Sequence, residues 1–220
     1  MSQPKSVVLL GKGDLAIRIS NWFLEQEQYD LLAVVPSMPE PDWTGSLASF
    51  ASKKGVPVIG SGRYEDLPQL ADHDWHPDMA FSVFYSRILS AEFIARCHRI
   101  LNLHNSPLPK YRGVSPINWA LKNGERSHGV SIHEISPGID DGPIVGQVSF
   151  PIYPEFDEVR DVYLRALAFG WELFRHVMPL FDSIEPRAQD PSLATIYYRK
   201  DDERLGDRRR FTRAESVSAE

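Results

Sequence analysis

Apolar, strand-like runs alternate with helix-patterned segments through the first half of this chain, and this alternation limits the possible folds more than any other feature. Each run is bounded by glycine, proline or a short polar turn. Strands joined by helices at this pace predict an α/β fold, a mostly parallel sheet with helices on both faces. The predicted strands are residues 5–10, 29–35, 56–60 and 99–105, together with a strand that runs into a loop within residues 79–89. The predicted helices are residues 14–26, with Asp14 as the cap, 46–55 and 90–97.

The second half predicts a short helix, two paired strands and a long helix. The short helix covers residues 116–124, with proline in its first turn and glycine at its end. Residues 128–135 and 143–152 alternate in polarity on either side of the turn 136–143, which predicts an antiparallel pair. An amphipathic helix from Glu158 to Leu180 closes the compact part.

We therefore predict one catalytic domain, residues 1–180, followed by a C-terminal extension, residues 181–220. Residues 194–200 have the pattern of a strand or of one arm of a hairpin, and basic residues gather in a charged tail from Arg199 to Arg213. Such a composition is more typical of a solvated chain end than of a binding surface.

Composition and charge restrict the partners. A net charge of −6 argues against a surface that neutralises nucleic-acid phosphates. The single cysteine, Cys97, cannot form an internal disulfide, which fits a reducing compartment. No apolar run is long enough to cross a bilayer, and the first residues are too soon interrupted for a secretory signal. We expect a soluble, cytoplasmic protein with neither nucleic acid nor membrane as a partner.

A glycine turn, Gly11-Lys12-Gly13, follows the first strand and resembles the start of a dinucleotide fingerprint. That interpretation needs an acidic residue at the end of the second strand to hold a ribose. The strand ends instead in valine, proline and Ser37. A tight turn beside a substrate pocket is therefore the better interpretation.

A metal site has to be weighed at residues 72–78, where two histidines and three aspartates lie close together. A proline interrupts this polar stretch and no second ligand cluster accompanies it, so a solvated turn is favoured and no metal is expected. Cys97 and His98 lie on a predicted helix, where packing is the simpler interpretation.

The loop 101–113 carries the clearest chemical pattern. Asn102 and His104 lie where the last predicted parallel strand ends, and strand residues two apart share one face. Ligands of open parallel sheets bind beyond these strand ends. An amide donor and an imidazole on one face suit oxyanion stabilisation and proton transfer, and the turn with Asp140 and Asp141 offers a carboxylate.

Three motifs together resemble the formyltransferases that use 10-formyltetrahydrofolate: residues 101–113, 123–135 and 137–147, in this order. That family includes methionyl-tRNA, glycinamide ribonucleotide and sugar N-formyltransferases. The resemblance implies a Rossmann-like fold, 10-formyltetrahydrofolate as the formyl donor and a catalytic set of Asn102, His104 and Asp140. Folate contacts are then expected at Phe84, Tyr85, Ser86, Arg87, Ile88, Leu89, Ile139 and Asp141, and acceptor contacts at Gly11, Lys12, Gly13, Lys110, Tyr111, Arg112 and His128.

The implied reaction fits these residue types. An amine attacks the formyl carbon, and Asn102 and His104 would stabilise the charge that develops on the formyl oxygen, where one good donor contributes roughly 3 kcal/mol. Asp140 would orient the imidazole and help to remove the amine proton.

The expected acceptor follows from the ways in which this sequence differs from other branches of the family. About forty residues follow the long helix, too few for the barrel domain that binds tRNA in the tRNA enzymes. The glycine turn differs from the phosphate loop of the glycinamide ribonucleotide enzymes, and the N-terminal regulatory domain of the related hydrolases has no counterpart. A nucleotide-linked amino sugar is therefore expected, which implies lipopolysaccharide O-antigen biosynthesis and a homodimer. Two alternatives remain: another amine acceptor, or a non-catalytic module that binds folate or a nucleotide sugar.

Overall fold

A computed structural model describes residues 3–209. The chain divides into two compact units. Of the described residues, 3–103 and Glu134–Pro137 form the first unit, and His104–His133 and 138–209 form the second. The end of the expected charged tail, residues 210–220, lies outside the described residues. The division at residue 180 into domain and extension stays a prediction.

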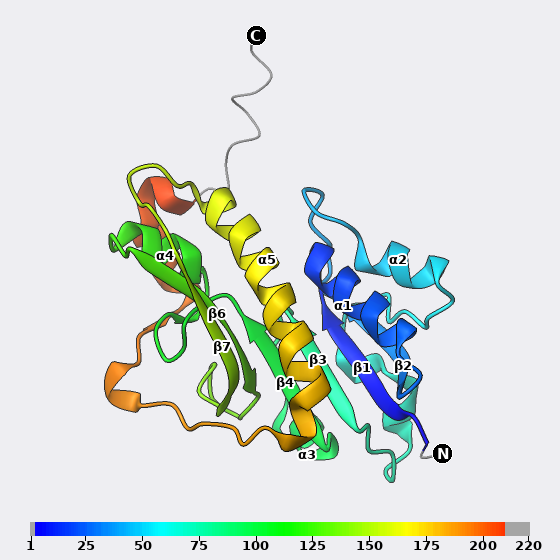
Figure 1. Cartoon of the computed structure of the whole chain (residues 1–220). Helices are drawn as coiled ribbons and strands as arrows, with labels where there is room; N and C mark the ends of the chain where they lie inside the picture. Colours follow the sequence, from blue (N-terminus) through cyan, green and yellow to red (C-terminus); the bar gives the residue numbers. More distant parts are fainter. Residues whose placement is uncertain (1–2, 210–220) are drawn as a thin grey trace. The chain divides into compact units, whose positions relative to one another are not determined.

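The first unit is a parallel α/β layer structure (Figure 1). Strand β1 pairs in parallel with β2 and β3, and β3 pairs in parallel with β4. Helix α1 packs on α2 and β2. The elements are β1 Lys5–Gly11, α1 Gly13–Glu25, β2 Tyr29–Pro36, α2 Leu47–Lys53, β3 Met79–Val83, α3 Ala91–Arg96 and β4 Arg99–His104, with short 3-10 turns at Tyr64–Asp66 and Pro68–Ala71.

Both faces of this parallel sheet are covered, which explains the uninterrupted apolar run of β1. All four residues from Val7 to Leu10 are completely buried. On one face Phe81 of β3 meets Phe23 of α1, with ring centroids 6.3 Å apart. On the other face Val8 belongs to a buried cluster that includes Phe93 of α3. A strand between two layers has no solvent side, so it needs no polar alternation.

The second unit is built on an antiparallel hairpin and a long helix. Strands β6, Ser127–Glu134, and β7, Ile144–Pro151, pair in antiparallel fashion, and α5, Val159–Val177, packs on β7 and α4, Pro116–Lys122. Two-residue strands β5, Arg112–Gly113, and β8, Ile196–Tyr197, pair in parallel. Short 3-10 segments follow at Met178–Ser183, Pro191–Leu193 and Arg199–Arg209. In the first unit the strand order is β2-β1-β3-β4 and every pairing is parallel, while β6 and β7 of the second unit pair with each other, so the predicted mostly parallel α/β sheet is confirmed.

Two sequence predictions in the first unit are wrong. Residues 56–60 make only one isolated bridge, between Val34 and Val58. Pro57 has no N–H to continue a ladder, although its carbonyl accepts from the Val34 N–H at 2.9 Å. Asp14 does not cap α1: the helix starts at Gly13, and Asp14 Oδ1 accepts instead from the Gly45 N–H at 3.0 Å.

Three further boundaries are set by single residues or short pairings. The strand expected to run into a loop within residues 79–89 ends at Val83, because Phe84 adopts a left-handed φ of 58°. The α-helix expected to reach Leu180 ends at Val177 and continues as a 3-10 turn, since Pro179 cannot donate the next helical hydrogen bond. The strand expected at 194–200 is the two-residue β8, paired with β5 and not with a hairpin partner.

We expect Gly11→Ala to destabilise the first unit by about 1–3 kcal/mol, as overpacking typically does. A Cβ at this position would lie 2.1 Å from the Val83 carbonyl oxygen, where β1 and β3 approach each other. Chemical denaturation measures the free energy of unfolding. Gly60→Ala is the control, because its Cβ would meet no heavy atom within 4 Å. An equal cost in both variants would contradict this account of the turn.

Candidate active site

His104 is the last residue of β4, and each of its two ring nitrogens has an oxygen atom nearby. The side chain is buried, and Nε2 lies 2.9 Å from the Tyr111 carbonyl oxygen. Because a carbonyl only accepts, Nε2 must carry a proton. Nδ1 lies 3.6 Å from Asp140 Oδ2, so it is the ring nitrogen left to exchange a proton.

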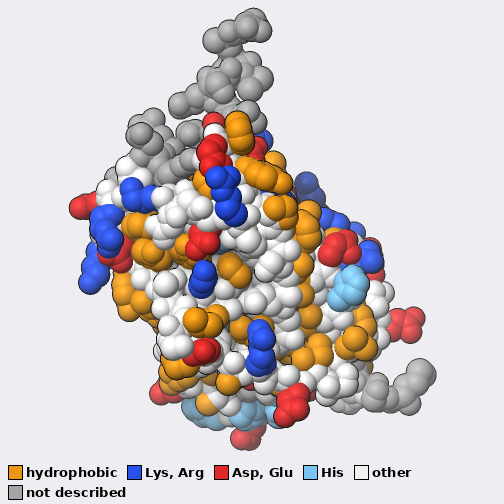
Figure 2. All heavy atoms as spheres, turned by 60° about the vertical axis from the view of Figure 1, so that its left-hand side comes forward, with side chains coloured by type: hydrophobic (Ala, Val, Ile, Leu, Met, Phe, Trp, Pro, Cys, Tyr) orange, Lys and Arg blue, Asp and Glu red, His pale blue; other side chains and the backbone are white. Residues whose placement is uncertain are grey.

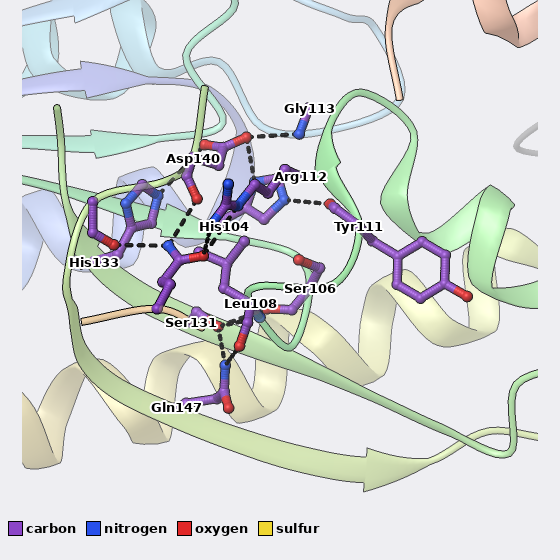
Figure 3. Close-up of polar contacts among 12 residues, drawn as sticks. His104, Ser106, Leu108, Tyr111, Arg112, Gly113, Ser131, His133, Asp140 and Gln147 are labelled. Carbon is purple, nitrogen blue, oxygen red and sulfur yellow. Dashed lines mark hydrogen bonds and ion pairs between the residues drawn. The ribbon is translucent and has the colours of Figure 1, made fainter. Parts of the chain in front are cut away.

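Asp140 is held by groups from three segments (Figure 3). Its Oδ2 accepts from the Gly113 N–H at 2.8 Å and faces His104, while its Oδ1 lies 3.5 Å from His133 Nε2. Burial opposes ionisation of this carboxyl, but the charges of His104 and His133 and the two hydrogen bonds together lower the pKa of Asp140 well below its usual value. The residue is therefore a carboxylate throughout the physiological range.

The backbone of Asp140 is left-handed, with φ of 48°. Tyr111, whose carbonyl accepts the hydrogen bond from His104 Nε2, is left-handed too, with φ of 61°. Such conformations cost of order 1–3 kcal/mol each and persist only where surrounding contacts enforce them. Both strained residues thus supply an oxygen atom that lies beside the His104 ring.

His133 is a site residue that the sequence reasoning did not single out. It is 2% exposed, and its ring lies edge-to-face with that of His104 at a centroid distance of 6.4 Å. The available signal was the period of two in β6, which puts His133 and Ser131 on one face of the strand. The carboxylate of Asp140 therefore lies between two buried imidazoles.

A chain of hydrogen bonds fixes the proline-containing loop after His104 (Figure 3). Ser131 Oγ donates to the Ser106 carbonyl at 2.7 Å and accepts from the Leu108 N–H at 3.1 Å. Gln147 Nε2 donates to the Leu108 carbonyl at 2.7 Å, and Ser106 Oγ donates to the Lys110 carbonyl at 2.7 Å. The loop is thereby tied to β6 and β7, which gives Tyr111 a defined position.

The remaining predicted residues of the second unit lie near these segments. Lys110 Nζ is 3.6 Å from Glu125 Oε1, and the Arg112 guanidinium donates to the Gln189 side chain. His128 is completely buried; its Nε2 donates to the Asn105 carbonyl at 2.8 Å, and burial lowers its pKa to about 4. The ligand contacts expected for Lys110, Tyr111, Arg112, His128, Ile139 and Asp141 stay predictions.

The other predicted contacts belong to the first unit. Asn102 lies on β4 two residues before His104, and its oxyanion role stays a prediction. In the segment expected to bind folate, the Tyr85 hydroxyl donates to the Gly62 carbonyl at 2.7 Å and Ile88 is 82% exposed. The ligand roles of Gly11, Lys12, Gly13, Phe84, Tyr85, Ser86, Arg87, Ile88 and Leu89 also stay predictions.

The two histidines of the polar stretch 72–78 both lie beside Arg96. His76 Nδ1 lies 2.9 Å from the Arg96 carbonyl, and the Arg96 guanidinium is 3.3 Å from His73 Nδ1. Within residues 3–209, no three His, Cys, Asp or Glu side chains gather in a way that would hold a metal ion. Over the same part of the chain, no helix has the length and apolar character needed to span a bilayer.

Comparison with known proteins gives concordant matches. Residues 61–178 match the family model described as formyl transferase. The methionyl-tRNA formyltransferase of Streptococcus gordonii is 30% identical over 213 residues, covering 90% of this chain and 67% of the relative. That of Fervidobacterium nodosum is 31% identical over 179 residues, covering 79% of this chain and 57% of the relative.

Two solved structures share the fold over most of this chain. The N-formyltransferase of Helicobacter canadensis, in complex with folinic acid and dTDP-3-aminofucose, has a TM-score of 0.76 and 27% identity, covering 90% of this chain and 72% of its own. A sugar 3N-formyl transferase was solved in the presence of dTDP and 5-N-formyl-THF. It has a TM-score of 0.75 and 25% identity, and the match covers 91% of this chain and 72% of that enzyme.

Proposed function

Because this chain belongs to the formyl transferase family, we propose that it transfers a formyl group from 10-formyltetrahydrofolate to the amine of a nucleotide-linked amino sugar. The single observation that carries formyl transfer is the buried Asp140 carboxylate facing His104 at 3.6 Å, within the matched family region.

The proposed step joins the amine nitrogen to the formyl carbon and breaks the bond between that carbon and N10 of the folate. The amine loses a proton, and N10 gains one. Since His104 Nε2 already donates to the Tyr111 carbonyl, Nδ1 beside Asp140 is the atom that carries this proton. Asn102 is the proposed donor to the developing oxyanion.

The solved relatives support the donor. The Helicobacter canadensis enzyme binds folinic acid, and the sugar 3N-formyl transferase was solved with 5-N-formyl-THF. These are two names for 5-formyltetrahydrofolate, which has the reduced pterin of the proposed donor and carries its formyl group on N5 instead of N10. We propose that this chain uses the same class of cosubstrate.

Two acceptors have support. The two solved relatives carry dTDP-3-aminofucose or dTDP, which favours a nucleotide sugar. The curated relatives are methionyl-tRNA formyltransferases, which favours an aminoacyl-tRNA. On the face drawn in Figure 2, the described Lys and Arg side chains are interspersed with Asp and Glu, and the chain has a net charge of −6. Such a surface is poorly suited to a polyanion, so we favour the sugar.

We expect the kcat/KM for a dTDP-linked amino sugar to exceed that for initiator methionyl-tRNA by about 100-fold or more, the scale on which sites built for one acceptor discriminate. Formyl transfer to each is measured with the same 10-formyltetrahydrofolate and enzyme preparation. Asp140→Asn, assayed alongside, excludes a contaminating activity.

Transfer to tRNA alone would reject the sugar and leave the catalytic assignment standing. Saturable binding of folinic acid without turnover on any amine would favour the binding-module alternative. A cytoplasmic location, a homodimer and a role in O-antigen biosynthesis remain predictions.

A further inference from the structure

We call residues 187–197 the bracing segment. It contacts two loops around His104 and Asp140: the loop that follows His104 and ends at Gly113, and the turn 136–143. At one end the Arg187 and Ile144 backbones exchange two hydrogen bonds, of 2.8 and 2.7 Å. At the other end Thr195 accepts from the Tyr111 N–H through its hydroxyl at 2.7 Å and from the Arg112 N–H through its carbonyl at 2.9 Å. The segment therefore contacts the first residue of β7, which follows the turn with Asp140, and also Tyr111 and Arg112 at the start of β5.

Gln189 lies between these two anchors, and its carboxamide contacts both loops. Its Nε2 donates to the carbonyls of Asp140 and Gly142, at 2.8 and 2.7 Å. Its Oε1 accepts from Arg112 Nε and Nη2, at 3.1 and 2.7 Å. One side chain thus uses both amide hydrogens and its oxygen to connect the two loops.

Residues 111–113, on either side of Arg112, carry the two backbone groups that fix the His104–Asp140 pair. The Gly113 N–H, adjacent to Arg112, holds Asp140 Oδ2, and the Tyr111 carbonyl, on the other side of Arg112, holds His104 Nε2. Asp140 keeps its left-handed backbone while its own carbonyl is bound by Gln189. The hydrogen bonds of Gln189 therefore help to keep Asp140 in its strained backbone conformation, and this conformation sets the position of its carboxylate.

We propose that Gln189 is a positioning residue for formyl transfer: by joining the Asp140 turn to Arg112, it holds the Asp140 carboxylate against His104. The inference rests on the formyl-transfer activity and not on the choice of acceptor. Gln189 lies outside residues 61–178, which match the family model, so this role belongs to the C-terminal part of the chain.

Gln189→Met removes every hydrogen bond of the carboxamide while keeping a side chain of similar length. We expect kcat to fall by about 10²-fold, the cost of misplacing a reacting group by about 1 Å, with the KM for the folate nearly unchanged. Gln69→Met is the control, because it makes the same chemical change at a partly buried glutamine of the first unit.

Gln189→Glu separates the two halves of the contact. A carboxylate still accepts from Arg112 but has no hydrogens for the Asp140 and Gly142 carbonyls. We expect a loss of kcat similar to that of Gln189→Met. Wild-type kcat in Gln189→Glu would show that anchoring Arg112 suffices, and would overturn the proposed hold on the Asp140 turn.

The pH dependence distinguishes positioning from a loss of folded protein. The Asp140 pKa is lowered by His104 of β4, by His133 of β6 and by the Gly113 N–H of β5. In Gln189→Met these contacts loosen, and the pKa of Asp140 rises toward its ordinary value. Simple destabilisation lowers kcat at every pH and leaves the pKa of Asp140 in the folded protein unchanged.

A measurement without substrate keeps the test independent of the proposed function. The ¹³C carboxyl resonance of Asp140, assigned by its loss in Asp140→Asn, is followed from pH 7 to pH 4. We expect no titration in the wild type and in Gln69→Met, and the onset of titration in Gln189→Met. A flat response in all three proteins would overturn the proposal whether or not an acceptor is known.

Discussion

Replacing Asp140 with asparagine is expected to lower kcat for formyl transfer by about 10²–10⁴-fold, the usual loss when a proton-transfer partner is removed. Asparagine adopts left-handed backbone as readily as aspartate, so the strained turn is kept. Its amide oxygen can still accept from the Gly113 N–H. What disappears is the negative charge that faces both His104 and His133.

Single-turnover kinetics with saturating donor and acceptor measure this effect on the chemical step. Asp182→Asn removes an exposed carboxylate from the same unit and serves as the control. Thermal unfolding shows whether both variants are folded. A turnover within about threefold of wild type in a folded Asp140→Asn protein would remove Asp140 from the proposed reaction.

His104→Gln is expected to cost a similar factor, about 10²–10⁴-fold in kcat. The glutamine amide can replace the hydrogen bond to the Tyr111 carbonyl, but it cannot accept and release a proton near neutral pH. His176→Gln is the matched control, because His176 is an exposed histidine of α5.

The double variant tests whether His104 and Asp140 act as one unit. If Asp140 works through His104, adding Asp140→Asn to His104→Gln should cost little more, since residues of one catalytic unit are strongly non-additive. Multiplication of the two single losses would mean that each residue acts independently, and would contradict the proposed pairing.

The elements that the sequence predicted correctly are those with a local physical signature. The continuous apolar run of β1 reflects burial on both faces, and the period of two in residues 128–135 reflects the β6–β7 hairpin. The errors occurred where one residue overrides the pattern around it. Pro57 prevents a ladder in an otherwise strand-like run, and Pro179 stops the α-helical hydrogen bonding of α5 before Leu180.

The candidate site was only partly predictable for a similar reason. His104 and Asp140 follow from a family motif, and the structure brings their side chains within 3.6 Å. Gln189 has no local signal at all, because its partner Asp140 lies 49 residues earlier in the chain. His133 had a strand signal but no partner within its own element, so its contact with Asp140 depends on how the turn folds back.

The bracing segment also bears on how such a chain can change over evolutionary time. Thr195 and Gln189 supply hydrogen bonds to the loops around His104, and Tyr197 stacks on Trp119 at a centroid distance of 4.1 Å. Gene fusion or exchange of the C-terminal part would therefore alter the rate of the chemistry along with any new binding surface. On the proposed role of Gln189, a chimera that exchanges the C-terminal part has to retain residues 187–197 with the core if the rate of formyl transfer is to be kept.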